Sequence, residues 1–436
     1  MHPKALMEAC TELVRLTLKF DHPADAVVAR FFRDNRTFGP RERAALAETV
    51  YAVLRKKLLF DHMAPSGSGP KERRLAILGF ARSTDAQGRE FLKGALTDQE
   101  AQWLARCDSI KVSDLMDRHR HSLPDWLVTP LKAQLGDGVG GGFWPLVAAL
   151  DTPAPLDLRV NALQDKRPDV QKELAKAAIK SVATPYSPWG LRIEGKPSLA
   201  KLDAFVRGAV EVQDEGSQLL ALVLDAKRGE MVVDFCAGAG GKTLAIGASM
   251  RNTGRLYAFD TSGHRLDALK PRLARSGLSN VHPAAIAHER DDRVKRLAGK
   301  IDRVLVDAPC SGLGTLRRNP DLKWRQSPKA VEELVAKQTA ILASAARLLK
   351  SGGRLVYATC SILPQENEEI ARAFSAANPE FVPLNMRELL EQLKVEQAAS
   401  LCSGPVQEGE QGGEFLRLWP HLHATDGFFA AAWVRK

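Results

Sequence analysis

Residues 230–243 read EMVVDFCAGAGGKT, and this stretch decides the fold class. Its apolar first half predicts a buried strand, its glycines predict a turn, and the apolar residues that follow predict a helix. The alternation continues downstream, where strands are predicted at RLYAFD (255–260), IDRVLVDA (301–308) and GRLVYATC (353–360), with helical patterns between them. Alternating strands and helices indicate a doubly wound parallel sheet. We therefore expect an α/β, Rossmann-like domain over residues 219–436.

Two further segments complete the pattern of this domain. Ser327-Pro328 is typical of a helix start and Gly352-Gly353 of a helix end, so we expect one long helix over residues 327–350. The tail segments FLRLWP (415–420) and GFFAAAWV (427–434) predict a terminal antiparallel pair of strands.

The first third of the chain has a different pattern. Residues 1–135 carry apolar residues at helical spacing and no alternating strand pattern. The run GDGVGGG (136–142) predicts a linker, because glycines at that density hold neither a helix nor a strand. We expect an all-α domain over residues 1–140, followed by a small α+β bridging subdomain over 141–218.

The composition excludes several classes of protein. The chain has 436 residues and 44% hydrophobic residues, which suits a globular protein with at least one large core. No apolar run approaches the ~18 residues of a membrane span, and the first twenty residues lack a signal-peptide pattern. Six cysteines without CxxC spacing argue against both a zinc site and a disulfide framework. We expect a cytoplasmic, metal-free monomer with reduced thiols.

The charge indicates a polyanionic partner. The formal net charge is +10, and basic side chains that neutralise phosphates gain affinity through counterion release. Most basic clusters are typical of a solvated surface, but the cluster within RRNPDLKWR (317–325) lies beside candidate catalytic residues. We expect Arg317, Arg318 and Lys323 to contact nucleic acid.

The loop DFCAGAGGKT (234–243) joins a strand to a helix, which is where such folds bind nucleotides. A phosphate-binding P-loop needs a glycine where Cys236 stands, and a dinucleotide fingerprint needs one where Thr243 stands. The third interpretation is an S-adenosylmethionine loop. Asp234 opens this loop, and Asp260 ends the next strand, where a carboxylate can bind ribose hydroxyls. We therefore expect S-adenosylmethionine as the cofactor.

Two cysteines follow predicted strands in the same way. Cys310 lies in DAPCSG (307–312) and Cys360 in ATCS (358–361). Taken singly, each would be a small buried apolar residue. Their strand ends, however, face the same crevice as the acids of the cofactor loop, because ligands of doubly wound sheets bind beyond the carboxyl ends of the strands. The shared position indicates a catalytic pair.

A thiol in this place suits methyl transfer to carbon 5 of a pyrimidine. That carbon becomes nucleophilic once a thiolate has added to carbon 6, and elimination of the thiol after proton loss completes the cycle. Addition leaves charge on the ring, which a hydrogen-bonding acid at N3 would relieve. Asp307, three residues before Cys310, is the candidate for this acid. The chemistry alone does not choose between Cys310 and Cys360 as the nucleophile.

The motifs carry a resemblance that covers nearly the whole chain. LRVN, VQDEGSQ, DFCAGAGGKT, DAPCSG, RRNPDLKW and ATCS occur in the order found in the RNA cytosine-5 methyltransferases of the Sun (RsmB-like) family. Residues 31–57 resemble the NusB-like RNA-binding domain of that branch. The resemblance implies a class I methyltransferase sheet, S-adenosylmethionine as cofactor and a structured RNA substrate, with 16S rRNA expected.

The resemblance also implies roles for individual residues. Cys360 is implied as the nucleophile and Cys310 as the residue that helps to release the product, while Asp307 and Lys242 reach the base. Arg159 and Asn161 are implied on the RNA side. The implied cofactor-binding residues are Cys236, Ala237, Gly238, Ala239, Gly240, Gly241, Lys242, Asp260 and Asp307.

The chain departs from the family pattern at two places. The family usually has Ala-Ala-Pro-Gly-Gly-Lys where this chain has AGAGGK (237–242), a change that leaves the backbone donors in place. An aspartate that contacts the adenine in the family falls at His288 here. Either Glu289 or Asp291 substitutes for it, or the contact is lost.

Other functions are weighed against this one. A transfer-RNA cytosine-5 methyltransferase would share every motif. An amino-methyltransferase would need no thiol and an Asp/Asn-Pro-Pro-aromatic strand end, which the DAPC sequence does not supply. An RNA-binding assembly factor with an inactive catalytic domain would not need Asp307, Cys310 and Cys360 together.

Overall fold

The computed structural model describes residues 1–195, 197–403 and 412–436, which form two compact units. The helical unit comprises Met1–Pro153 and Thr315–Pro328, and the sheet unit comprises Ala154–Gly314 and Lys329–Lys436. Residues 141–153 therefore belong with the helices, and the expected bridging subdomain shares a unit with the main sheet from Ala154 onward. The division into three domains stays a prediction.

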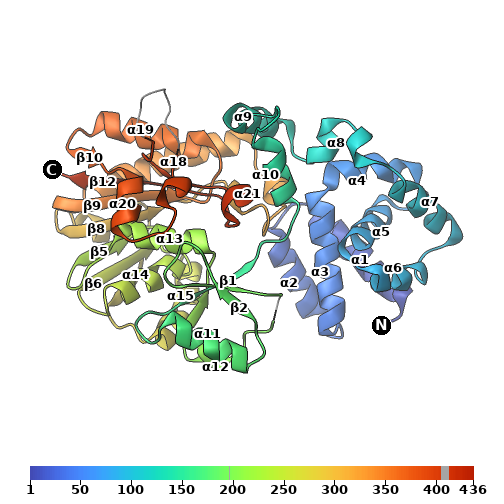
Figure 1. The fold of residues 1–436 in the computed structure, drawn as a ribbon, viewed down its shortest axis with the longest axis horizontal. Helices are drawn as coiled ribbons and strands as arrows, with labels where there is room; N and C mark the ends of the chain where they lie inside the picture. The colour runs from blue at the N-terminus through green and yellow to red at the C-terminus, as the bar shows by residue number, and fades with distance from the viewer. Residues whose placement is uncertain (196, 404–411) are drawn as a thin grey trace. The chain divides into compact units, whose positions relative to one another are not determined.

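The helical unit is built from amphipathic helices, as expected for its first 135 residues (Figure 1). Its helices are α1 (Pro3–Thr17), α2 (Ala24–Asp34), α3 (Pro40–Arg55), α4 (Lys57–Met63), α5 (Lys71–Ser83), α6 (Ala86–Lys93), α7 (Asp98–Asp108), α8 (Asp117–His121), α9 (Asp125–Leu135), α10 (Phe143–Leu150) and the separate α17 (Leu322–Arg325). Local signals set their ends; α7, for example, starts with a capping box between Thr97 and Glu100. The apolar faces of α1, α3 and α5 meet in a core that contains Leu13, Leu46 and Leu75.

The sheet unit begins with a small antiparallel sheet of strand order β2-β3-β1-β4. Its elements are β1 (Leu156–Val160), α11 (Arg167–Lys176), β2 (Ser181–Ala183), β3 (Gly190–Ile193), α12 (Asp203–Val206) and β4 (Val210–Val212). This mixture of short strands and helices confirms the α+β character expected of the region.

The main sheet has the order β10-β12-β9-β8-β5-β6-β7, with β11 paired to β12. Strands β5 to β9 run parallel, while β10 and β11 pair antiparallel with β12, which itself pairs antiparallel with β9. The doubly wound sheet and the terminal antiparallel pair are confirmed. The strands are β5 (Met231–Asp234), β6 (Arg255–Asp260), β7 (Val281–Ala285), β8 (Ile301–Asp307), β9 (Leu349–Thr359), β10 (Phe381–Pro383), β11 (Leu416–Leu418) and β12 (Phe428–Arg435).

Helices cover both faces of this sheet (Figure 1). They are α13 (Glu215–Leu224), α14 (Gly241–Ser249), α15 (Gly263–Ser276), α16 (Asp292–Lys295), α18 (Pro328–Ala346), α19 (Glu368–Ala377), α20 (Met386–Gln392) and α21 (Pro420–His423), with the 3-10 turns η3 (Leu313–Thr315) and η4 (Pro364–Glu366). Side chains alternate along each strand, so Val232 packs with α13, α14 and α15, whereas Val233 packs with α18 and α19. The alternation explains why the buried strands are apolar on both faces.

The end of the long helix differs from the expectation. Helix α18 ends at Ala346, and Gly352 and Gly353 lie inside β9. Ile301 pairs with Leu349 but Arg303 pairs with Arg354, so β9 carries extra residues at this point. Gly352 has a φ of 77°, a value that glycine adopts without strain. The glycines thus allow an irregularity in the strand and do not close the helix.

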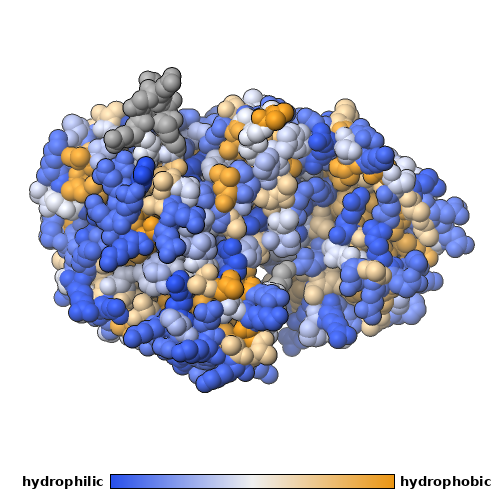
Figure 2. Space-filling model, viewed as in Figure 1, coloured by the Kyte–Doolittle hydropathy of each residue, from blue (hydrophilic) through white to orange (hydrophobic). Residues whose placement is uncertain are grey.

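The surface seen in Figure 2 is mostly hydrophilic, with apolar residues in small separate patches. Within the described residues, no helix is long and apolar enough to cross a membrane.

Candidate active site

The carboxyl ends of β5, β6, β8 and β9 open into a cavity of about 670 Å³, a size typical of ligand pockets. Asp260, Asp307, Cys310 and Cys360 line it, together with Cys236 of the glycine-rich loop. Four strand ends that are far apart in sequence therefore supply one site. The parallel topology brings them together, as the sequence predicted.

The glycine-rich loop turns sharply into α14. Gly240 precedes this helix with a φ of 82°, and a Cβ atom there would lie 2.1 Å from Leu269 Cδ1. Only glycine fits both the backbone angle and the space. The loop is held from both sides: Gly238 N donates to Asp260 Oδ2 at 2.8 Å, and Arg272 Nη1 donates to Ala239 O at 2.6 Å.

Asp260 is the carboxylate best placed for a ligand. It is 6% exposed and lines the cavity while it accepts hydrogen bonds from Gly238 N and, at 2.7 Å, from Ser262 N. Asp234 is different, because burial raises its pKa to about 7 and Thr243 Oγ1 donates to its Oδ2 at 2.6 Å. Asp234 therefore anchors the start of α14, and its other buried oxygen, Oδ1, has no hydrogen-bond partner among the residues that the structure describes.

This arrangement fits S-adenosylmethionine. The carboxylate of Asp260 ends the strand that follows the loop, at the distance in sequence where ribose hydroxyls are bound in such folds. Of the loop itself, Phe235 and Cys236 line the cavity. When bound, S-adenosylmethionine supplies an electrophilic methyl group, and the residues around the cavity must hold the acceptor in front of it.

Lys242 and Asp307 form an ion pair at the edge of the cavity. Lys242 Nζ lies 2.7 Å from Asp307 Oδ2. Burial alone would lower the pKa of Lys242, but the charge of Asp307 and its hydrogen bond outweigh burial and raise it. The ammonium group therefore stays protonated at neutral pH, beside a carboxylate that reaches the cavity.

The two cysteines face each other across the strand ends. Their Sγ atoms are 3.4 Å apart. The hydrogen bond with Cys360, together with burial, raises the pKa of Cys310 well above its ordinary value. Cys310 thus keeps its proton at neutral pH and can donate a hydrogen bond to the sulfur of Cys360. The pair expected from the sequence is brought together by the structure.

The residues around position 288 separate into two groups. His288 and Glu289 line the cavity. Asp291 instead accepts hydrogen bonds from Ala287 N and Arg293 N, both at 2.9 Å, and so shapes the turn before α16. Of the candidates for an adenine contact, His288 and Glu289 are therefore the ones that reach the site.

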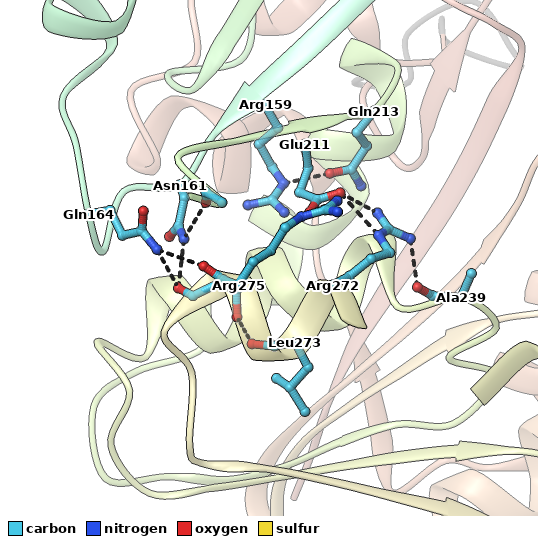
Figure 3. Close-up of polar contacts among 11 residues, drawn as sticks. Arg159, Asn161, Gln164, Glu211, Gln213, Ala239, Arg272, Leu273 and Arg275 are labelled. Atoms are coloured by element: carbon cyan, nitrogen blue, oxygen red, sulfur yellow. Dashed lines mark hydrogen bonds and ion pairs between the residues drawn. The ribbon is translucent and has the colours of Figure 1, made fainter. Parts of the chain in front are cut away.

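Arg159 and Asn161 lie in a buried polar network that joins the small sheet to α15 (Figure 3). Arg159 Nε donates to Gln213 Oε1 at 2.6 Å, and burial lowers the pKa of Arg159 to about 10 despite the nearby Glu211. Asn161 Nδ2 donates to Gly208 O and Ser276 O at 3.1 and 2.9 Å. Their described contacts are internal, and a role toward RNA stays a prediction.

Glu211 connects this network to the cofactor loop. Figure 3 shows Arg272 and Arg275 of α15 converging on its carboxylate, at 2.9 and 2.6 Å. Arg272 also donates to Ala239 O of the loop. The small sheet thereby supports the glycine-rich loop through the ion pair between Glu211 and Arg272. No local pattern marks Glu211 or Arg272, and the sequence analysis did not identify them.

The basic cluster at 317–325 requires a correction. Lys323 is 5% exposed, and its Nζ donates to Arg55 O and Ser122 O, both at 2.7 Å, inside the helical unit. Arg317 is also 5% exposed. Both side chains are buried within the protein, so we withdraw Arg317 and Lys323 as RNA contacts. Arg318 is half-buried, and its contact with RNA stays a prediction.

Glu366 is a further residue that the sequence analysis missed. It lies behind the two cysteines, is fully buried, and accepts hydrogen bonds from Ser311 and Ser361. An acid six residues after a cysteine gives no local signal of burial, so only its position in the fold reveals these contacts.

Fold and site together define an S-adenosylmethionine-dependent methyltransferase. The family model described as 16S rRNA methyltransferase RsmB/F matches residues 221–434, and the model of the associated ferredoxin-like domain matches residues 123–200. The probable ribosomal RNA small subunit methyltransferase B of Synechocystis is 36% identical over 90% of this chain and 91% of its own length. That of Bacillus subtilis is 29% identical over 91% of each chain.

Among solved structures, the crystal structure of PH0851 superposes with a TM-score of 0.76 and 27% identity, covering 100% of this chain and 99% of that one. The chain belongs to the RsmB/F family of rRNA small subunit methyltransferases.

Proposed function

We propose that this protein methylates carbon 5 of a cytosine in 16S rRNA through a covalent adduct between Cys360 and carbon 6 of the base. The observation that carries the proposal is the pair of sulfur atoms 3.4 Å apart in a cavity that Asp307 also lines. Methylation of a ring nitrogen or a ribose hydroxyl needs no thiol, whereas a carbon 5 acceptor needs one to become nucleophilic.

Cys360, Asp307 and Lys242 have separate roles in the proposed reaction. Cys360 Sγ, as thiolate, forms the bond to carbon 6, and the ring takes up the electron pair toward N3. The ammonium group of Lys242 can pass a proton through the carboxylate of Asp307 to N3, which neutralises the developing charge. Carbon 5 then accepts the methyl group, N3 returns its proton through Asp307 to Lys242, and the proton of carbon 5 passes to a solvent water that acts as the base.

Release requires the carbon–sulfur bond to break with the electron pair returning to Cys360. Cys310 keeps its proton at neutral pH, and its S–H can donate a hydrogen bond to the departing thiolate at 3.4 Å. Because this help is needed only at the end of the cycle, replacing Cys310 and replacing Cys360 should stop the reaction at different steps.

Replacing each cysteine by alanine tests the proposal. Cys360→Ala should give neither methylated RNA nor a covalent complex, whereas Cys310→Ala should transfer the methyl group and stay bonded to its RNA. Denaturing gel electrophoresis with labelled RNA separates these outcomes. Cys402→Ala, which replaces a cysteine outside the cavity lining, is the matched control and should behave like the wild type.

The reverse gel pattern would exchange the two roles, and full activity in both variants would remove both thiols from the mechanism. Bisulfite sequencing of total RNA from cells with and without the gene identifies the substrate. One methylcytosine lost from 16S rRNA supports the proposal, while a loss from transfer RNA contradicts the substrate assignment.

A further inference from the structure

The carboxylate of Glu366 bridges the two loops that carry the cysteines. Its Oε1 accepts a hydrogen bond from Ser311 N at 2.8 Å, and its Oε2 accepts from Ser311 Oγ at 2.5 Å and from Ser361 Oγ. Ser311 directly follows Cys310, and Ser361 directly follows Cys360. One buried side chain therefore contacts the residue next to each thiol.

The surroundings of Glu366 hold its carboxylate in place. Gln338 Nε2 of α18 donates to Oε1 at 2.9 Å and also to Pro309 O at 2.9 Å. The hydroxyl of Tyr357 donates to the backbone oxygen of Glu366 at 2.6 Å. The acid is fixed by contacts with a helix, a strand and both cysteine loops.

The hydrogen bonds described for this carboxylate come from neutral donors, although Glu366 is 0% exposed. Burying a polar carboxyl group costs free energy that only hydrogen bonds offset. An apolar side chain of similar size would fill the same space without that cost. The acid must therefore supply something other than packing, and its contacts point to the geometry of the two loops.

We propose that Glu366 is a positioning residue that sets the placement of Cys310 relative to Cys360. The two thiols follow different strands, β8 and β9, and a second link between their loops is the hydrogen bond from Gly314 N to Cys360 O at 2.8 Å. The catalytic consequence rests on the proposed function, in which both sulfurs act on one ring. A misplacement of about 1 Å in such a site costs on the order of 10²-fold in rate.

The experiment measures thiol geometry and catalysis separately. Glu366→Gln keeps the size of the side chain but replaces one acceptor oxygen by a donor. In the full-length protein, a short dithiol-specific cross-linker reports the proximity of Cys310 and Cys360, with the linked peptides identified by mass spectrometry. Steady-state kinetics on 16S rRNA give kcat and KM. The matched control is Glu368→Gln, which alters an acid two residues later that pairs with Arg417 at 3.4 Å.

We expect Glu366→Gln to slow the cross-linking and to lower kcat on the order of 10²-fold with KM for S-adenosylmethionine unchanged, while the control matches the wild type. Glu366 does not line the cavity, so cofactor affinity should not follow kcat. If Glu366→Gln fails to fold, Ser311→Ala and Ser361→Ala each remove one hydroxyl donor to the carboxylate and should show smaller changes in the same direction.

A wild-type cross-linking rate in Glu366→Gln would overturn the proposal, even if activity fell, because the acid would then support the fold alone. A wild-type protein that forms no 5-methylcytosine would contradict the proposed function, and the cross-linking comparison would still decide the role of Glu366.

Discussion

The residue types and positions in this site follow from where the strands end and from how much space neighbouring side chains leave. Gly240 is required because a side chain would collide with Leu269, and Asp260 lines the cavity because β6 ends there. The thiols illustrate a finer effect: the hydrogen bond between them keeps the proton on Cys310. A neighbouring side chain, and not residue type alone, thus sets the pKa of the Cys310 thiol.

At this scale we predict that Asp260→Ala weakens S-adenosylmethionine binding. The ribose hydroxyls lose a charged acceptor, and Gly238 N loses its partner, so the loss should be about 1.5 to 3 kcal/mol. Isothermal titration calorimetry measures it. Asp267→Ala, which removes an acid 64% exposed on α15, is the control. Unchanged affinity in a folded Asp260→Ala protein would show that the loop has been misinterpreted.

Among the elements, the segment from Thr315 to Pro328 stands apart from its sequence neighbours. It leaves the sheet unit and packs in the helical unit, where Trp324 Nε1 donates to Leu54 O at 2.8 Å and Arg55 Nη2 donates to Arg317 O at 3.0 Å. Lys323 completes this packing with two carbonyl contacts, and burial lowers its pKa to about 7. Lys323, which the basic motif suggested as an RNA contact, therefore anchors this segment inside the helical unit.

Lys323 should make stability depend on pH. Its pKa is about 7 in the folded protein and about 10.4 in an unfolded chain. Between these values the unfolded chain binds the additional proton, so the free energy of unfolding should rise with pH across this window.

Lys323 alone can change the free energy of unfolding by at most about 1.4 kcal/mol per pH unit. Urea denaturation from pH 7 to 10 measures it as the difference between the wild type and Lys323→Met. Lys111→Met, at an exposed lysine of the helical unit, should show no such difference. Parallel curves for wild type and Lys323→Met would mean that Lys323 stays charged in the folded protein.

For the whole molecule, the net charge of +10 is distributed over both units, and the exposed part of it decides RNA affinity. Removing the helices is a poor test, because the segment Thr315–Pro328 would lose its packing partners. A better test replaces exposed arginines of the helical unit. Arg33 lies on α2, Arg36 in the turn that follows it and Arg41 on α3, and all three can be replaced without disturbing the core.

We predict that replacing these three arginines by alanine weakens RNA binding and reduces the slope of log affinity against log salt by about 2. Filter binding at several salt concentrations measures the slope. The control replaces Lys172, Lys176 and Lys180, which are exposed in the sheet unit. An equal fall in both variants, or none in the first, would argue against the helical unit as an RNA-binding arm.

Local patterns determined much of this protein. Hydrophobic alternation around residues 230–243 and the strands that follow predicted the doubly wound sheet, and parallel topology then required Asp260, Asp307, Cys310 and Cys360 to meet at one edge. These features follow from short-range sequence, because periodicity and glycine turns act over a few residues.

Only the tertiary structure decided the rest. In the folded chain, Lys323 and Arg159 are buried, and the glycines at 352–353 lie within a strand. Glu366 contacts the residues that follow both cysteines. The sequence does not show whether the side chain of a charged residue is solvated or buried. Its role is set by partners far away in sequence, as with Ser122 for Lys323 and Ser311 for Glu366, and those partners are chosen by packing of the whole chain.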